Sequence, residues 1–322
     1  MASSIAQGQD HVPDLRTLGL DSAAVRLLRS TRGYQALARH LVTGEVDVAD
    51  IPVGTSGRSA AQVARAAALK AGEILMDRLH KVKEVSFKGR GNIVTDVDME
   101  VEREIFAILG AEFPEAALLG EESARVRADE GLVWIVDPLD GTRNYASGIP
   151  IFSTVVGLAL DGEVLVGVNY DPARKDMFAA EKGAGAFLNG ERIHVSDTDA
   201  IEDGILGMDM SYNNEGAANG LDVVREIWPD MQTVRIIGSA AMGISYAAAG
   251  LTDLYFHHQL EPWDQVAGLL LVEEAGGVIT DRTGKRAGLY SDGLVASNVG
   301  LHTEFMRRTD GMAWRRPTHE LV

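Results

Sequence analysis

Residues 132–142 read LVWIVDPLDGT, and this segment constrains the fold more than any other part of the sequence. Its first six residues are apolar and rich in β-branched side chains, which predicts a buried strand over 132–137. Asp137 ends that strand, Pro138 favours an extended conformation for the residue before it, and Asp140 follows. Two carboxylates at close range repel each other, and one is normally forced to protonate. Either something positive holds the pair together or the segment lies on a plain surface turn.

A hard divalent cation removes the conflict between Asp137 and Asp140, because all-oxygen ligands are what Mg²⁺ takes. A turn here can direct both carboxylates and the Leu139 carbonyl into one small volume. Gly141 lets a phosphate approach the backbone, and a helix that begins at Thr142 offers its free amide groups to an anion. Asp-Pro and Asp-Gly pairs also mark ordinary turns. The buried-strand context and acidic partners elsewhere favour a divalent-metal phosphoester site.

Further acidic residues lie at predicted strand ends, in tight loops or at helix starts, so they can converge with this segment. They are Asp96 and Asp98, Glu121 and Glu122, and Asp264. Three of them have a simpler interpretation. Glu122 is then a solvent-facing neighbour of Glu121, Asp96 is a helix-start acid favoured by the dipole, and Asp264 only stabilises a helix N-terminus. We leave Asp96 and Glu122 outside the candidate site and keep Asp264, because it lies in the segment WDQVAG.

Two long helices are predicted in the first half of the chain. Residues 59–79 place apolar side chains at helical spacing. Thr95 and Asp98 fit a capping-box-like start, and the apolar face that follows extends to Leu109. Residues 1–57 form an appended segment in which we find no chemistry, with short helix candidates at 21–30 and 33–42.

Hairpins and then alternating helices and strands follow. Asp161-Gly162 and Asn189-Gly190 each lie between strand-like runs, which is a strong hairpin signal. The elements expected are strands at 151–160 and 163–171, a further hairpin within 186–195 that turns at Asn189-Gly190, and helices at 239–250 and 262–276. The pattern predicts a layered α and β protein with two lobes that meet near residue 195.

Composition narrows the partners and the compartment. The formal charge of −17 argues against nucleic acid or an anionic membrane, because an acidic surface gains no counterion release from either. The chain has no cysteine, which excludes disulfides, thiolate catalysis and Cys-ligated metals and favours a reducing cytosol. The first residues lack the plan of a signal peptide, and no apolar run approaches the roughly 20 residues that span a bilayer. We predict a soluble, cytoplasmic protein.

Over about residues 58–310 the sequence resembles the magnesium-dependent, lithium-sensitive phosphomonoesterases typified by inositol monophosphatase. Six segments in family order carry the resemblance: GNIVTDVD at 91–98, GEES at 120–123, WIVDPLDGTRNY at 134–145, GAGAFLNG at 183–190, GSAA at 238–241 and WDQVAG at 263–268. The resemblance implies an α+β fold, a layered αβαβα sandwich, and a homodimer. It divides the chain into an extension of unknown role (1–57), a lobe with most metal ligands (58–195) and a lobe that adds Asp264 and the substrate pocket (196–322).

The resemblance also implies metal ligands. Glu121, Asp137 and the Leu139 carbonyl would hold one metal, and Asp137, Asp140 and Asp264 a second, so that Asp137 bridges. Glu121 would also reach a third, looser metal. Two to three Mg²⁺ ions per site are implied, with Mn²⁺ able to substitute.

Other residues would bind substrate and direct water. Gly141 and Thr142 would bind the phosphate through their amides. The Thr142 hydroxyl, paired with Asp98, would orient the attacking water, and Glu121, Thr142 and Asp98 form the catalytic set. Further substrate contacts would come from Asp140, Gly238, Ser239, Ala240, His257 and Asp264.

The sequence departs from the family where the alcohol part of the substrate should lie. His257 stands where inositol-hydrolysing members often carry a glutamate, and Arg143 replaces the second threonine common in DGTTN. Neither change touches an expected metal ligand, so catalysis is expected while inositol specificity stays open. Lys88 and Arg90 either assist electrostatically or are solvated loop cations. GRG at 89–91 and GAG at 183–185 lack the full G-x-G-x-x-G, which argues against a dinucleotide site.

We therefore expect a Mg²⁺-dependent phosphomonoesterase that acts on a small polyol or sugar phosphate, most of all inositol 1-phosphate, by metal-activated water. Fructose 1,6-bisphosphate and histidinol phosphate are the alternative substrates. DGTRNY differs from the DGTKGF-type run of nucleotide 3′-phosphatases, which disfavours that class. A different class, a non-catalytic regulatory or interaction protein on the same scaffold, is the further alternative.

Overall fold

The computed structural model of the protein describes residues 51–81, 85–87, 93–123 and 130–316. The short helices predicted at 21–30 and 33–42 lie outside these residues. The chain forms two compact units, 1–59 and 60–322. In the described part of the first unit, Val53 pairs with Ser59 in an isolated antiparallel bridge. All helices and strands named below belong to the second unit, and the division into lobes near residue 195 stays a prediction.

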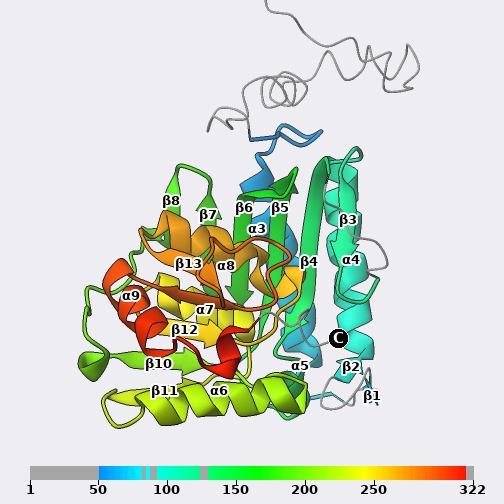
Figure 1. Cartoon of the computed structure of the whole chain (residues 1–322). Coiled ribbons are helices and arrows are strands. Elements are labelled where there is room, and N and C mark those ends of the chain that lie inside the picture. Colours follow the sequence, from blue (N-terminus) through cyan, green and yellow to red (C-terminus); the bar gives the residue numbers. More distant parts are fainter. Residues whose placement is uncertain (1–50, 82–84, 88–92, 124–129, 317–322) are drawn as a thin grey trace, which may run out of the picture. The chain divides into compact units, whose positions relative to one another are not determined.

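The larger sheet has seven strands and lies in the first half of the second unit (Figure 1). β3 and β4 are parallel, and all other neighbours are antiparallel. In spatial order its strands are β3 (Ala117–Gly120), β4 (Leu132–Asp140), β5 (Ser153–Leu160), β6 (Glu163–Asp171), β7 (Asp176–Glu181), β8 (Gly185–Leu188) and β9 (Glu191–Arg192). Both predicted hairpins are present. Asp161, Gly162, Asn189 and Gly190 all have positive φ, as two-residue type I′ turns require.

Strand β4 is longer than the sequence pattern predicts. We expected it to end at Asp137, but its pairing with β5 resumes at Asp140, opposite Ser153, after an irregularity between the two acids. An interruption of this kind bends a strand and redirects its side chains without ending it. The hairpin predicted within 186–195 is formed by β8 and β9, but its second strand is shorter than predicted, because β9 already ends at Arg192.

The second sheet has five strands. In spatial order they are β11 (Thr233–Ile236), β10 (Ile205–Met208), β12 (Leu254–His257), β14 (Leu294–Ser297) and β13 (Val278–Asp281). β10 is parallel to both β11 and β12, whereas β14 is antiparallel to its two neighbours. The carboxyl ends of three strands therefore meet at one edge. A separate two-stranded ribbon pairs β1 (Val85–Phe87) with β2 (Ile93–Thr95).

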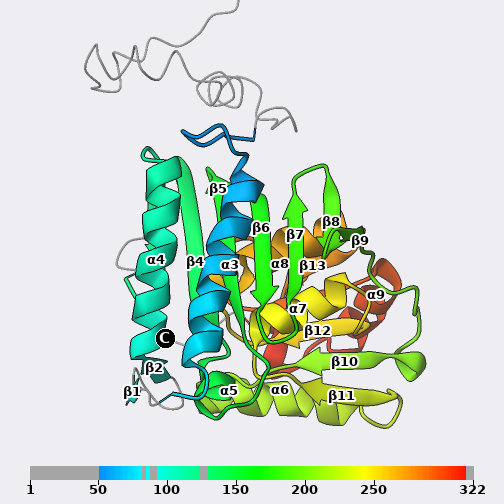
Figure 2. The same ribbon diagram turned by 180° about the vertical axis from the view of Figure 1, so that it is seen from behind.

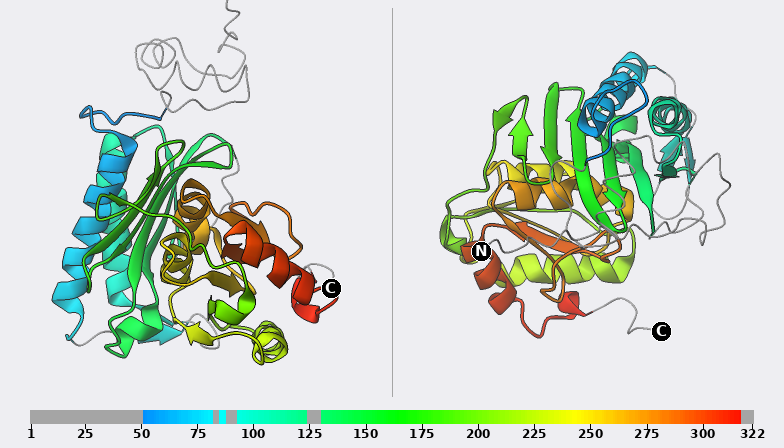
Figure 3. Two further views of the ribbon diagram at one scale, coloured as in Figure 1. Left: turned by 90° about the vertical axis from the view of Figure 1, so that its left-hand side faces the viewer. Right: turned by 90° about the horizontal axis from the view of Figure 1, so that it is seen from above.

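Helices complete five alternating layers, which Figure 3 shows from the side. α3 (Ala60–Arg78) and α4 (Asp96–Glu112) cover one face of the seven-stranded sheet, as seen from behind in Figure 2. α7 (Ala240–Ala248) and α8 (Pro262–Glu274) lie between the two sheets, and their apolar side chains form one core with both. α6 (Asn214–Ile227) and α9 (Val299–Arg308) pack on the other face of the five-stranded sheet. The predicted αβαβα sandwich is confirmed.

Short helices complete the second unit. α5 (Thr142–Ala146) follows β4 directly. The described residues of this unit also form two 3₁₀ helices, η3 (Ile201–Asp203) and η4 (Ala313–Arg315). The predicted capping box at the start of α4 is confirmed. The Thr95 side chain accepts a backbone amide of the first helical turn, and the Asp98 side chain accepts the backbone amide of Thr95. Among the described residues, no helix is both long and apolar enough to cross a bilayer.

Helix α8 packs closely on the seven-stranded sheet because two strands carry glycine where the helix crosses them. A Cβ at Gly157 would lie 2.3 Å from Val266 Cγ2, and a Cβ at Gly167 would lie 2.8 Å from Ala267 Cα. At its other end, Glu274 accepts hydrogen bonds from the amides of Gly183 and Gly185 at 2.6 and 2.7 Å. The GAG segment is thus a structural link to α8, which agrees with the rejection of a dinucleotide site.

Candidate metal and phosphate site

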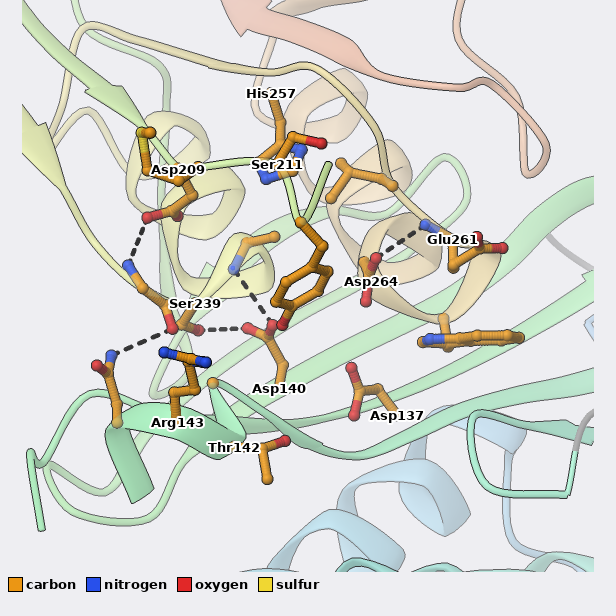
Figure 4. A pocket seen from close by; sticks show the side chains of 18 of the residues that line it. Asp137, Asp140, Thr142, Arg143, Asp209, Ser211, Ser239, His257, Glu261 and Asp264 are labelled. Carbon is orange, nitrogen blue, oxygen red and sulfur yellow. Dashed lines mark hydrogen bonds between the residues drawn. The ribbon is translucent and has the colours of Figure 1, made fainter. Parts of the chain in front are cut away.

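A pocket of about 470 Å³ opens where the end of β4 faces the N-termini of α7 and α8 (Figure 4). The predicted site residues that line it are Glu121, Asp137, Leu139, Asp140, Gly141, Thr142, Gly238, Ser239, Ala240, His257 and Asp264. Asp98 is buried beside the pocket and contacts Thr142. The fold therefore brings together segments that are distant in sequence. The individual roles of these residues stay predictions.

Three carboxylates form the centre of the pocket. Asp137, Asp140 and Asp264 each present an oxygen, and these atoms lie within 4.8 Å of one another. Asp137 also accepts a hydrogen bond from the Leu139 amide at 2.9 Å, which turns its carboxylate back over the bulge. Asp264 comes from the first turn of α8, where it accepts the Glu261 amide at 2.8 Å in a capping box. Asp137 and Asp264 are thus each fixed by a backbone amide of their own segment.

The cluster is electrostatically unfavourable without a cation. Burial raises the pKa of Asp137 well above its ordinary range, and the charges of Glu121, Asp140 and Asp264 raise it further. Burial likewise raises the pKa of Asp264, with Asp140 as the next cause. Burial raises the pKa of Asp140 to about 6, although hydrogen bonds to its oxygens lower it. A divalent ion would replace this repulsion with attraction.

Asp140 is held by the N-terminus of α7. Ser239, the N-cap, donates its hydroxyl to one carboxylate oxygen, and the amides of Ala240 and Ala241 donate to the two oxygens at 3.2 and 3.0 Å. A carboxylate at this end of a helix is favoured by the dipole and satisfies free amides. Ser239 and Ala240 were predicted to contact substrate. Their donors instead support Asp140, and a substrate role for them stays a prediction.

Thr142 and Asp98 form the expected pair. The Thr142 hydroxyl lies 3.3 Å from Asp98 Oδ1 and 3.0 Å from the Leu139 carbonyl. Asp98 is fully buried and also accepts the Thr95 amide at 2.9 Å. Burial raises the pKa of Asp98 to about 6, while the Thr95 hydrogen bonds lower it. A buried carboxylate thus faces the hydroxyl at the pocket floor.

Gly141 links β4 to α5 in a conformation that favours glycine. Its φ is +88°, and a Cβ there would lie 3.0 Å from the Ile151 carbonyl and 3.1 Å from the Gly238 carbonyl. A side chain would therefore be strained by the left-handed backbone and crowded by backbone on both sides. The bare backbone of Gly141 and Thr142 is what the pocket floor presents at this point.

Glu121 reaches the pocket by the same topology as Asp137. β3 and β4 are parallel with Gly120 opposite Val136, so Glu121, just after β3, lies level with Asp137 of β4 at the same edge. The Glu121 amide donates to the Val136 carbonyl at 3.2 Å. Glu121 lies outside the group of oxygens within 4.8 Å, but its charge is the second cause of the raised pKa of Asp137.

The opposite wall carries polar groups suited to an alcohol. His257 is buried there, and its Nδ1 accepts the Gln259 amide at 3.1 Å, so the neutral ring carries its proton on Nε2. Burial lowers the pKa of His257 to about 4, with nearby His258 as the next cause. Asp209, Ser211 and Gln259 also line this wall. Of these wall residues, the sequence analysis identified only His257.

The sequence analysis also considered three cations, Arg143, Lys88 and Arg90. Arg143 lines the pocket and lies beside Thr142 in Figure 4, on the side away from His257, and its expected position beside the alcohol stays a prediction. Lys88 and Arg90 lie outside the described residues.

Asn144, which was not predicted, donates its side-chain amide to the carbonyls of Ile151, Ile237 and Gly238 at 2.9 to 3.1 Å. It ties the segment after β4 to the turn before α7.

The donor set fits a hard divalent cation. Mg²⁺ binds oxygen at about 2.1 Å, so ligands on opposite sides of one ion lie about 4.2 Å apart. Three carboxylate oxygens within 4.8 Å of one another match this spacing with small adjustments. No thiolate is available as a ligand, since the chain has no cysteine. The residues present therefore suit Mg²⁺ or Mn²⁺.

Comparison with known families gives a match over most of the chain. Residues 58–311 match the model of the inositol monophosphatase family. A fructose-1,6-bisphosphatase/inositol-1-monophosphatase of Thermotoga maritima is 36% identical over 74% of this chain and 91% of its own length. An inositol-1-monophosphatase of Mesorhizobium japonicum is 38% identical over 75% of this chain and 92% of its length.

Other similar proteins carry names of a different kind. The Nus factor SuhB of Escherichia coli K12 is 34% identical over 73% of this chain and 90% of its length. Among solved structures, the extragenic suppressor protein suhB of Bartonella henselae superposes with a TM-score of 0.74 at 34% identity, over 78% of this chain and 98% of that one.

Proposed function

The chain belongs to the inositol monophosphatase family, and from this premise we propose that it is a Mg²⁺-dependent phosphomonoesterase that acts on a small polyol or sugar phosphate. The observation that carries the proposal is the convergence of Asp137, Asp140 and Asp264, whose oxygens lie within 4.8 Å of one another in a pocket that Gly141 and Thr142 also line. Inositol 1-phosphate is the first substrate to test, because relatives at 36% and 38% identity carry that activity in their names.

The acids would hold the metal ions. Asp137, Asp140 and Asp264 would bind one, and Glu121, Asp137 and the Leu139 carbonyl another, with Asp137 shared. The bound metal lowers the pKa of water and stabilises charge on the phosphate and on the leaving alkoxide. Asp140 needs no further orientation, because three donors of α7 already fix both of its oxygens.

The remaining groups would position substrate and water. The amides of Gly141 and Thr142 would donate to phosphate oxygens at the pocket floor. The Thr142 hydroxyl would accept from the attacking water while it donates to Asp98, which lies 3.3 Å away. On the opposite wall, His257 Nε2–H would donate to a substrate hydroxyl, because its Nδ1 already accepts the Gln259 amide. No side chain is required as a covalent nucleophile.

The proposal is tested with a panel of phosphate esters with and without Mg²⁺, by release of inorganic phosphate. Inositol 1-phosphate, fructose 1,6-bisphosphate and histidinol phosphate distinguish the candidate substrates, and Mn²⁺ is expected to substitute for Mg²⁺. Asp137→Asn should abolish turnover and leave the fold intact. Asp96→Asn is the matched control, because Asp96 lies near Asp98 in sequence but pairs with Arg78. Absence of turnover on every ester would refute the proposal, and an active Asp137→Asn variant would refute the bridging role.

A regulatory role is the second candidate. Relatives at 34% identity are named Nus factor SuhB, a name that refers to no enzyme activity. The two roles separate by experiment, because a purely regulatory protein should tolerate Asp137→Asn. We further propose that the protein is cytoplasmic and forms a homodimer. Light scattering of the full chain and of a variant lacking residues 1–57 would test the homodimer.

A further inference from the structure

Asp209 lies in the pocket wall but was not among the residues identified from sequence. It directly follows β10, which is the middle one of three parallel strands, with β11 and β12 on either side. One of its oxygens accepts the amide of Gly238, just beyond β11, at 2.5 Å. The other accepts the hydroxyl of Tyr255, from β12, at 2.9 Å. One side chain therefore ties together the carboxyl ends of all three strands.

The turn that Asp209 holds is the turn that supports Asp140. Gly238 has a φ of +79° and its carbonyl accepts the Asn144 side-chain amide at 3.1 Å. The next residue, Ser239, caps α7 and donates to Asp140 (Figure 4). The path from Asp209 to the acid cluster thus consists of hydrogen bonds and one peptide link.

Resting on the proposed phosphatase function, we propose that Asp209 is a positioning residue, which fixes the Gly238–Ser239 turn and through it holds Asp140 in place for the metal. Without its acceptor, the Gly238 amide would lose its buried partner and the turn would be free to shift. Asp140 would then lose well-placed donors while it still faces the repulsion of Asp137 and Asp264.

The geometry favours positioning over direct contact with substrate. Asp209 is only 8% exposed, and both of its oxygens already accept hydrogen bonds, one from the Gly238 amide and one from the buried Tyr255 hydroxyl. Tyr255 is fully buried and cannot move away from it. Burial raises the pKa of Asp209 to about 7, which agrees with a site that needs the shape and acceptor atoms of the side chain more than its charge.

Two variants of Asp209 separate shape from charge. Asp209→Ala removes the acceptor for Gly238. Asp209→Asn keeps Oδ1 as that acceptor, and its amide can donate to the Tyr255 hydroxyl oxygen. Asp253→Ala is the matched control, since Asp253 is equally buried in the same sheet and accepts the Ile205 amide at the opposite end of β10, at 2.7 Å.

Three quantities are measured on the full chain: turnover at saturating Mg²⁺, Mg²⁺ affinity by calorimetry, and hydrogen exchange of the Gly238 amide. We expect Asp209→Ala to lower turnover and Mg²⁺ affinity by about 10- to 100-fold, as for other residues that orient metal ligands. It should also lose protection at Gly238. Asp209→Asn should recover most of both losses and keep the protection. Asp253→Ala should melt earlier but keep turnover and Mg²⁺ affinity.

Three outcomes would overturn the inference. Equal losses of turnover and Mg²⁺ affinity in Asp209→Asn and Asp209→Ala would show that the charge of Asp209, and not its shape, is what the site needs. A loss of Mg²⁺ affinity in Asp253→Ala as large as in Asp209→Ala would reduce it to general instability. A Gly238 amide that exchanges without protection in the wild type would contradict the inference. This measurement is decisive even if Asp209→Ala does not fold. If no phosphate ester is hydrolysed, the proposed function fails, but Mg²⁺ affinity and exchange still decide this inference.

Discussion

Replacement of Gly167 by alanine tests whether the packing of α8 sets the geometry of the site. Gly167 lies on β6, directly under α8, and a Cβ there would meet Ala267 Cα at 2.8 Å and the Ala267 carbonyl oxygen at 2.9 Å. Because both atoms belong to the helix backbone, no side-chain rotation relieves the contact. To reach 3.4 Å, where ordinary contacts begin, helix and strand must separate by about 0.6 Å.

That displacement is large on the scale of a metal site. Asp264 lies on the same helix, three residues before Ala267, while Asp137 and Asp140 lie on the seven-stranded sheet. A shift of the helix therefore changes the distances within the acid cluster directly. Binding constellations need to be held within about 0.5 Å of the productive geometry, and a misplacement of about 1 Å can lower a rate by about 10²-fold.

We expect Gly167→Ala to lower the free energy of unfolding by about 1–3 kcal/mol, the usual cost of an overpacked core. Turnover should fall by about 10-fold, and the Mg²⁺ concentration for half-maximal activity should rise. Urea denaturation and a Mg²⁺ titration of phosphate release measure the two effects. Gly288→Ala is the control, because nothing lies within 4 Å of a Cβ at Gly288.

Gly157 provides a matched comparison, because a second substitution can relieve the clash that alanine makes there. The three atoms nearest to a Cβ at Gly157 all belong to the side chain of Val266, its two γ-carbons at 2.3 and 2.7 Å and its Cβ at 3.1 Å. Gly157→Ala should therefore be rescued in part by Val266→Ala, whereas no substitution at Ala267 should rescue Gly167→Ala. The reasoning is refuted if Gly167→Ala loses stability but keeps the turnover and Mg²⁺ dependence of the wild type.

Three further predictions concern the acids. Mg²⁺ at about 100 times its dissociation constant should raise the free energy of unfolding by about 2.7 kcal/mol, and a thermal melt should show that Asp264→Asn loses this gain. The folded state binds the Asp209 proton more tightly than the unfolded chain, so stability is lost as pH rises from about 4 through about 7. Over that window Asp209→Asn should lose less than the wild type by up to about 4 kcal/mol, measured by urea denaturation at each pH. Ser239→Ala removes the cap of α7 and a donor to Asp140; it should cost about 1–2 kcal/mol in urea and lower turnover more than an N-cap change at Asn298, which caps α9 away from the pocket.

The sequence was sufficient to predict the acid cluster because its members lie where local rules fix direction. Asp137 comes directly after the apolar run of a buried strand, and Asp264 follows Pro262 at a helix start. Strand ends and helix N-termini at one edge of a layered fold converge, so the acids could be expected to meet. The hairpins at Asp161-Gly162 and Asn189-Gly190 were predictable for the same reason, since a two-residue turn depends only on its own residues.

The supporting residues were not predictable, because their roles depend on distant partners. Asp140 is separated from Ser239 by 99 positions, and no local pattern indicates that an acid of β4 meets the amides of α7. Asp209 follows a short strand, but the strand ILGM is broken by glycine and carries no turn signal after it. The GAG of 183–185 was rejected as a dinucleotide loop from its motif, but only the structure shows that the amides of Gly183 and Gly185 donate to Glu274.

The middle helical layer explains why stability and site geometry should change together in this protein. α8 supplies Asp264, and α7 supplies the donors that hold Asp140, although Asp140 itself belongs to the seven-stranded sheet. The acids therefore repel one another across a boundary between layers, where the apolar core that both helices share with the sheets holds them together. A metal ion at that boundary would bind elements of both layers at once. Its removal should then loosen the contact between sheet and helices before it unfolds either, and amide exchange in the first turns of α7 and α8 should report this first.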